Sequence, residues 1–134
     1  MSIIINTDGG ARGNPGPAAL GFVIRKGGET VAAKGEYLGD SLTNNWAEYQ
    51  ALIRALEEAL KLGFDGERLE VRMDSELIVK QMRGEYKVKH PDLKPLNTRV
   101  RELVERFGDV QFVHVRRAEN KDADRLVNEA LDAR

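Results

Sequence analysis

Four acidic residues stand where secondary-structure elements are expected to begin or end: Asp8, Glu48, Asp74 and Asp124. Asp8 closes an apolar run at 3–5, and Asp74 follows an alternating segment at 69–73. Carboxylates at the ends of elements can converge on one cleft, where their mutual repulsion has to be balanced by a cation. A divalent metal ion meets this need, so the four residues favour phosphoryl chemistry.

Each of these acids also has a purely structural explanation. Glu48 could complete a capping box in the first turn of a helix, and Asp74 could cap the short helix that follows it. Asp124 could complement the dipole at the start of the last helix. Asp8 is the hardest to explain in this way, because aspartate is depleted in strands and this one ends the expected central strand. One shared site explains all four residues more simply than four coincidences.

The composition is that of an ordinary globular chain. Its 134 residues, 41% hydrophobic and 32% charged, suit a single domain spanning 1–134. With a net charge of −1, any contact with nucleic acid has to be a local basic surface. The absence of cysteine excludes disulfides and thiolate metal sites. No apolar stretch approaches the roughly 18 residues that span a bilayer, and no leader is recognisable, so a cytoplasmic protein without membrane contact is expected.

The first part of the chain predicts a meander of strands. A strand is expected at 2–8, with β-branched residues that indicate burial on both faces. The segment 9–17, rich in glycine and proline, predicts a tight loop without regular structure. Two further strands are expected at 18–25 and 30–38, joined by a glycine-containing hairpin turn.

Helices and strands alternate in the remainder. A helix of about five turns should start after residues 43–45 and end near Gly63; its apolar stripe is Tyr49, Leu52, Ile53, Leu56 and Leu60. The later elements are a strand at 68–73, helices at 75–82 and about 93–106, a strand at 109–116 and a helix at about 120–132. This order predicts an α/β sheet whose first three strands are antiparallel and whose later strands arrive by crossovers.

Taken together, the motifs resemble ribonuclease H of type 1. The matching stretches are Thr7–Gly16, Thr43–Glu48, Met73–Glu76 and Asn120–Asp124. The resemblance runs over essentially the whole chain, and the motifs follow the order of the family's elements. It implies a ribonuclease H-like fold, a mixed five-stranded sheet with helices on both faces.

The resemblance also implies an activity, the hydrolysis of the RNA strand of RNA–DNA hybrids to leave 5′-phosphate and 3′-hydroxyl ends. Two Mg²⁺ ions would serve as cofactors, with Mn²⁺ as a substitute. Asp8 would bridge the two ions, and Glu48 and Asp74 would join it on the leaving-group side. Asp124 would hold the ion that activates the attacking water. Hard oxygen ligands suit these metals.

A second set of residues is implied to hold the substrate: Gly10, Gly13, Asn14, Thr43, Asn44, Asn45 and Gln81. The glycines would let the backbone approach the sugar edge of RNA. The amide side chains would read the minor groove, including the 2′-hydroxyl. Thr43 would lie near a DNA phosphate, although residues 43–45 could also simply cap the helix.

The chain departs from the family pattern in two places. Many bacterial members carry a glycine-rich loop with a histidine before the last acid, and here Arg116 and Arg117 stand at that point. Arg117 is therefore a candidate contact for the departing product. The long basic protrusion of many members is reduced to a short segment with Lys87 and Lys89 as candidate phosphate contacts. This compact form resembles archaeal and some bacterial members.

Two alternatives remain beside this interpretation. A nuclease of the same fold could also act on double-stranded RNA, or the chain could be an inactive module that only binds nucleic acid. Inactive relatives usually lose one of the acids, and all four are present here. A monomer is expected.

Overall fold

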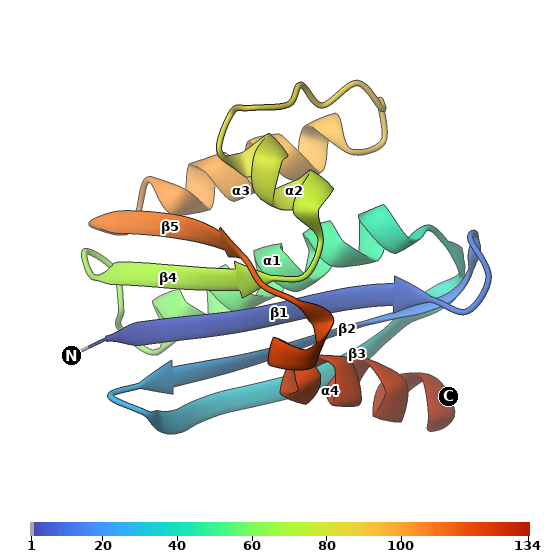
Figure 1. The fold of residues 1–134 in the computed structure, drawn as a ribbon, viewed down its shortest axis with the longest axis horizontal. Coiled ribbons are helices and arrows are strands. Elements are labelled where there is room, and N and C mark those ends of the chain that lie inside the picture. Colours follow the sequence, from blue (N-terminus) through green and yellow to red (C-terminus); the bar gives the residue numbers. More distant parts are fainter. Residues whose placement is uncertain (1) are drawn as a thin grey trace.

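Five strands form one mixed sheet in the computed structural model, which describes residues 2–134. The strands are β1 (Ile3–Ala11), β2 (Gly16–Lys26), β3 (Glu29–Leu42), β4 (Arg68–Met73) and β5 (Asp109–His114), in the spatial order β3-β2-β1-β4-β5 (Figure 1). The pairs β1–β2 and β2–β3 are antiparallel, whereas β1–β4 and β4–β5 are parallel. The predicted antiparallel start, the later crossovers and the central position of the first strand are confirmed.

Helices cover both faces of this sheet, as expected. They are α1 (Asn44–Lys61), α2 (Glu76–Met82), α3 (Lys94–Val104) and α4 (Lys121–Asp132), with a short 3-10 helix, η1 (Arg117–Glu119), before the last. Figure 1 shows α1 behind the sheet and α4 in front of it. None of the helices within 2–134 has the length and apolar character needed to cross a membrane.

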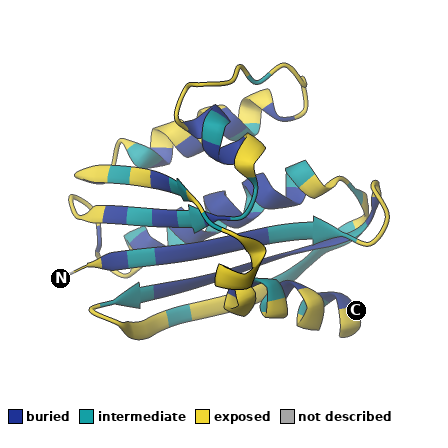
Figure 2. Cartoon of the chain, viewed as in Figure 1, coloured by how far each residue is buried: buried dark blue, intermediate teal, exposed yellow. Residues whose placement is uncertain are grey.

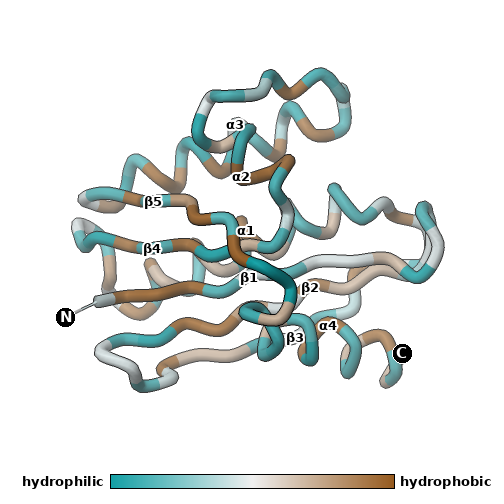
Figure 3. Tube along the Cα trace, in the orientation of Figure 1, coloured by the Kyte–Doolittle hydropathy of each residue, from teal (hydrophilic) through white to brown (hydrophobic). Residues whose placement is uncertain are grey.

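The two faces hold apolar cores of different size. The larger core lies between the sheet and α1, where Tyr49, Leu52 and Leu56 are fully buried. Figure 2 shows the buried residues along the central strands. The smaller one joins Ala19 to Val127 on α4. Figure 3 shows the corresponding hydrophobic stretches along β1 and β4. The helical stripe predicted from the sequence thus faces the sheet, and burying each large side chain contributes about 1.5–3 kcal/mol.

The prediction that 9–17 forms a loop without regular structure is wrong at both ends, because β1 includes the first three of these residues and β2 includes the last two. Gly9 and Gly10 continue β1 and pair with Leu20 and Ala19 of β2. Glycine is unfavourable in a strand unless another part of the backbone comes close. Such a contact exists here, since a Cβ on Gly9 would lie 2.4 Å from the carbonyl carbon of Ala47 in α1. The strand therefore carries its glycine because a helix backbone lies against it.

Two other boundaries differ for reasons of long-range pairing. β3 extends to Leu42, beyond the expected 30–38, because it pairs along β2 as far as Gly16. β5 ends at His114 and not at 116, since its parallel partner β4 ends at Met73. Sequence patterns mark where a strand can form, and the length of its neighbour sets where pairing stops.

The contact at Gly9 predicts a difference between two adjacent glycines. Gly9→Ala should lower the free energy of unfolding by about 1–3 kcal/mol, the typical cost of overpacking. Gly10→Ala is the matched control, because its Cβ would lie 3.9 Å from its nearest neighbour, and its effect should stay below about 1 kcal/mol. Urea denaturation of both variants measures this, and equal effects would contradict the proposed role of the helix contact.

Candidate active site

Asp8 and Glu48 meet at a single backbone amide. Asp8 lies on β1 with 7% of its surface exposed, and Glu48 lies on α1 with 6% exposed. The N–H of Gly9 donates to Oδ1 of Asp8 at 3.0 Å and to Oε1 of Glu48 at 2.5 Å. The capping-box explanation of Glu48 is wrong, because Thr43 caps α1 by accepting from the N–H of Trp46 at 3.2 Å. Glu48 instead reaches across to the central strand.

Asp74 joins this pair from the end of β4. Carboxylate oxygens of Asp8, Glu48 and Asp74 all lie within 4.8 Å of one another. The capping explanation of Asp74 is also wrong, because Ser75 is the N-cap of α2 and its Oγ accepts from the N–H of Ile78 at 3.4 Å. Helix capping therefore does not explain why an aspartate stands at position 74.

Asp124 approaches the other three carboxylates from the face of the sheet opposite to α1. It sits in the first turn of α4, and 30% of its side chain is exposed. All four acids line one cleft of about 490 Å³. Its other lining residues are Gly9, Gly10, Ala11, Arg12, Asn44, Asn45, Ser75, Arg117, Val127, Asn128 and Leu131. The structure thus brings together the four carboxylates that the sequence singled out.

The carboxylates disturb one another strongly. Burial, followed by the charges of Asp74 and Asp124, raises the pKa of Asp8 to about 8. Burial and the same kind of repulsion raise the pKa of Glu48 well above its ordinary value. The pKa of Asp74 is raised as well, chiefly by burial, although the nearby Arg117 guanidinium acts in the other direction. In the absence of a further cation, the cluster tends to hold protons.

This cluster has the properties of a divalent-metal site. Its donors are hard carboxylate oxygens, which suit Mg²⁺, Mn²⁺ or Ca²⁺. Two arginines line the cleft: Arg117 lies 3.6 Å from Asp124, and Arg12 pairs with Asp132 at 2.8 Å. The negative charge of four acids exceeds what Arg117 can balance. A divalent cation fits the residues present.

Near the cluster, backbone N–H groups hold the side chains of two asparagines in a defined orientation. Oδ1 of Asn44 accepts from the N–H of Ala11 at 2.7 Å, and Oδ1 of Asn14 accepts from the N–H of Asn44 at 3.0 Å. Because each oxygen faces a backbone donor, the assignment of oxygen and nitrogen in both amides is fixed. Each NH₂ group is then directed away from these partners and can donate to a ligand.

The other residues predicted to hold substrate are distributed unevenly. Gly10 and Asn45 line the carboxylate cleft, whereas Asn14 and Thr43 line a neighbouring hollow that Asn45 also borders. Gly13 occupies the exposed turn after β1 with a φ of 90°. Their contacts with a substrate stay predictions.

Gln81 lies apart from this group. Only 5% of its surface is exposed, and its Oε1 accepts from the hydroxyl of Tyr49 at 2.7 Å. Tyr49 in turn accepts from Nδ2 of Asn97 at 3.1 Å. The side chain of Gln81 thus belongs to a buried polar network between α1, α2 and α3, and this placement does not support the predicted contact with the minor groove.

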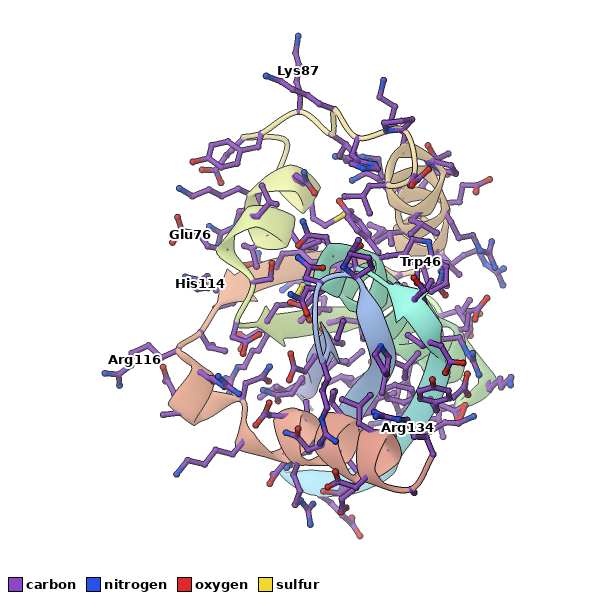
Figure 4. The ribbon with its side chains drawn as sticks, turned by 90° about the vertical axis from the view of Figure 1, so that its right-hand side faces the viewer. Trp46, Glu76, Lys87, His114, Arg116 and Arg134 are labelled. Carbon is purple, nitrogen blue, oxygen red and sulfur yellow. The ribbon has the colours of Figure 1, made fainter. Side chains whose placement is uncertain are left out.

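The lysines are also separate from the acids. Lys87 and Lys89 are exposed in the loop between α2 and α3, where they border a hollow with Tyr86. Figure 4 shows Lys87 at the outer end of that loop, on the side of the sheet opposite α4. A ligand bound in the cleft can contact these two lysines only if it is long enough to extend across α2.

The sequence did not single out three residues that line the cleft, Arg12, Ser75 and Asn128. Arg12 and Ser75 stand inside the recognised motifs, so their position was a usable signal. Asn128 had none, because it is a polar residue on the exposed side of an amphipathic helix. It faces the cleft through contact with the guanidinium of Arg12 at 3.4 Å.

Comparison with known proteins gives consistent matches. The family model described as reverse transcriptase-like matches residues 6–130. Ribonuclease HI of Halobacterium salinarum is 51% identical over 93% of this chain and 62% of its own length. The bifunctional protein Rv2228c of Mycobacterium tuberculosis is 46% identical over 99% of this chain, which spans 36% of that protein. Ribonuclease H of Nitrosomonas eutropha is 32% identical over 96% of this chain and 89% of its own length.

Solved structures match at the level of the whole fold. RNase H1 from Halobacterium salinarum superimposes with a TM-score of 0.93 at 47% identity, covering 100% of both chains. LC11-RNase H1, solved in complex with an RNA/DNA hybrid, gives a TM-score of 0.92 at 52% identity, covering 98% of both chains.

The raised pKa of Asp8 predicts how stability depends on pH. The folded protein keeps a proton on Asp8 up to about pH 8, whereas the unfolded chain releases it near the ordinary pKa of 3.8. Stability from this group is therefore present below about pH 4 and lost as the pH rises to about 8. In metal-free buffer with EDTA, the free energy of unfolding should fall over this range.

Asp8→Asn should flatten that decline, because it removes one of the interacting charges. Between about pH 5 and pH 8 the stability of the variant relative to the parent should grow by at least about 1.4 kcal/mol, the equivalent of one pKa unit. Asp65→Asn, at an exposed position outside the cluster, is the control and should keep the slope of the parent. Urea denaturation at each pH gives the answer, and equal slopes for Asp8→Asn and the parent would refute the coupling.

Proposed function

We propose, since the chain belongs to the type 1 ribonuclease H family, that it hydrolyses the RNA strand of RNA–DNA hybrids and leaves 5′-phosphate and 3′-hydroxyl ends. The observation that carries this proposal is the meeting of four carboxylates in one open cleft. An inactive module would have no use for a cluster whose members raise one another's pKa. The structure of LC11-RNase H1 with an RNA/DNA hybrid supports the choice of substrate.

Divalent cations would be held by Asp8, Glu48, Asp74 and Asp124. We propose two Mg²⁺ ions, with Mn²⁺ as a substitute, because the donors are all hard carboxylate oxygens. When bound, such ions offset charge on the phosphate and activate water. The chain's own contribution is to keep the carboxylates close together. Gly9 donates to Asp8 and to Glu48 of α1, Asp74 follows the end of β4, and α4 brings Asp124 from the other face of the sheet.

The asparagines would distinguish RNA from DNA. The NH₂ groups of Asn14 and Asn44 are fixed as donors by the backbone contacts of their oxygens. A 2′-hydroxyl can accept such a hydrogen bond, and a deoxyribose cannot. Gly10 lines the same cleft without a side chain, so the backbone of a substrate can approach β1.

The working form, the location and the range of substrates complete the proposal. All four acids come from one chain, which supports a monomer as the working form. We propose a cytoplasmic protein, for which the lack of cysteine is suitable. Double-stranded RNA also carries 2′-hydroxyls in its minor groove, so it remains the alternative substrate to be compared with the hybrid.

The proposed function is tested by comparing duplexes of the same sequence. With Mg²⁺ present, the purified protein should cut the RNA strand of a labelled hybrid at least about 1,000-fold faster than duplex DNA, since a site built to bind a hydroxyl rejects ligands that lack it. EDTA should stop the reaction. Equal rates on hybrid and duplex DNA would overturn the proposal, and cleavage of double-stranded RNA would widen the substrate class to the alternative.

Asp74→Asn separates a metal ligand from a structural residue. Cleavage of the hybrid should nearly cease, because the variant lacks a charge that the metal needs. In EDTA the variant should equal or exceed the parent in stability, by on the order of 1 kcal/mol, because like-charge repulsion is relieved. It should also gain less stability than the parent when Mg²⁺ is added.

Ser75→Ala provides the contrast for Asp74. Ser75 is the residue that caps α2, so its loss should cost about 1 kcal/mol of stability while most of the cleavage activity remains. Thermal unfolding and initial rates of both variants decide the matter. An active Asp74→Asn variant would remove this residue from the site.

Arg117 is proposed to act on the negatively charged substrate or product through its charge. Its guanidinium lies 3.6 Å from Asp124, and its side chain is 79% exposed at the edge of the cleft. Arginine keeps its proton near neutral pH, so its effect is electrostatic. Arg117→Ala should slow turnover roughly fivefold, as expected of a largely exposed charge, and Arg117→Lys should slow it less. Equal losses in both variants, or none in either, would count against this role.

A further inference from the structure

A pair of buried asparagines joins the two faces of the sheet behind the carboxylate cluster. Asn6 lies on the central strand β1 with 6% of its surface exposed, and Asn120 lies immediately before α4 with 1% exposed. Nδ2 of Asn6 donates to Oδ1 of Asn120 at 3.0 Å. Neither residue lines the cleft with the four acids.

Both asparagines are unusual for their local positions. Asparagine is depleted in strands, yet Asn6 stands inside the central strand of the sheet, paired on both sides. Asparagine at an N-cap normally accepts a hydrogen bond from the first turn, yet the side chain of Asn120 makes no such bond to α4. Since buried amides are costly unless paired, their mutual contact accounts for both departures.

The contacts of Asn120 lead directly to two of the proposed metal ligands. Its Nδ2 donates to the carbonyl oxygen of Thr7 at 2.9 Å, and Thr7 immediately precedes Asp8. Its own carbonyl oxygen accepts from the N–H of Asp124 at 3.1 Å. One residue thus connects the backbone next to Asp8 with the backbone of Asp124.

Glycines in β2 and β3 let the backbone of α4 lie directly on the sheet. A Cβ on Gly21 would lie 2.5 Å from the carbonyl oxygen of Ala123, and one on Gly35 would lie 2.5 Å from that of Leu126. Ion pairs from Arg12 to Asp132 at 2.8 Å and from Arg25 to Asp122 at 2.5 Å also hold α4, but both lie partly exposed to solvent. The hydrogen bonds of Asn120 differ from these because they are buried, directional and next to Asp124, so they are the contacts best placed to set the position of its carboxylate.

We propose that Asn120, supported by Asn6, is a positioning residue that sets the distance between Asp124 and Asp8 and thereby the affinity of the cluster for divalent cations. This inference rests on the proposed use of the four carboxylates as metal ligands. It concerns a residue that contacts neither substrate nor metal. Residues that orient ligands in this way change metal affinity or activity by about 10–100-fold when removed.

The test is a metal titration of the 134-residue chain without substrate. Calorimetric titration with Mn²⁺ should show an affinity about 10–100-fold lower for Asn120→Ala than for the parent. Asn6→Ala should show a smaller loss, because the bond from Asn120 to Thr7 persists. Asn97→Ala, which deletes another buried amide on α3 with its bond to Tyr49, is the matched control and should bind Mn²⁺ like the parent.

A double-variant cycle separates positioning from a general loss of stability. If Asn120 acts through Asp124, Asn120→Ala should cost little further Mn²⁺ affinity in an Asp124→Asn background. The inference is overturned if Asn120→Ala lowers the Mn²⁺ affinity by the same factor with and without the Asp124 carboxylate. It is also overturned if Asn97→Ala, at equal thermal stability, weakens Mn²⁺ binding as much as Asn120→Ala does. Should Asn120→Ala not fold, Asn6→Ala carries the same cycle.

The titration also distinguishes this inference from the proposed function. A parent protein that binds Mn²⁺ but cuts no hybrid would refute the function, and the cycle would still decide whether Asn120 positions Asp124. In the cleavage assay at limiting metal, Asn120→Ala should lower kcat while leaving the KM for hybrid close to that of the parent. A change confined to KM would contradict positioning.

Discussion

The approach of α1 to β1 at Gly9 is the contact on which the rest of the site depends. The helix backbone lies so close to the strand that a side chain at Gly9 would meet Ala47. This closeness lets Glu48 accept a hydrogen bond from the same N–H that serves Asp8. A larger residue would separate helix and strand and thereby the first two carboxylates. A packing constraint in the sheet and the geometry of the cluster are therefore the same feature.

The sheet itself determines how four acids can meet. β1 and β4 are parallel neighbours, so Asp8 and Asp74 emerge near the same edge. Glu48 arrives on a helix from one face and Asp124 on a helix from the other. Carboxyl ends of strands are common ligand positions in α/β proteins for this reason. Here one cleft collects residues that are widely separated along the chain.

Concentrated negative charge makes the cluster costly without a cation. Burial and repulsion raise the pKa of Asp8 to about 8, so the folded protein carries protons that its unfolded form would release. Other contacts offset this repulsion. The larger apolar core packs α1 against the sheet, and the hydrogen bond between the amides of Asn6 and Asn120 links α4 to the central strand. A fold that keeps repelling groups together has to be held by interactions elsewhere.

The sequence alone determined the four acids, the type and order of the elements and the apolar face of α1, because these depend on residue type and on neighbours a few positions away. It also placed Thr43 among the capping residues, and the structure confirms that it caps α1. Only the tertiary structure decided that Gly9 and Gly10 belong to a strand, that Glu48 and Asp74 have no capping role, and that Gln81 is buried against Tyr49. Local rules could not decide these points, because a close backbone approach, a shared donor or a buried hydrogen bond between an amide and a tyrosine hydroxyl depends on residues distant in sequence that only packing brings together.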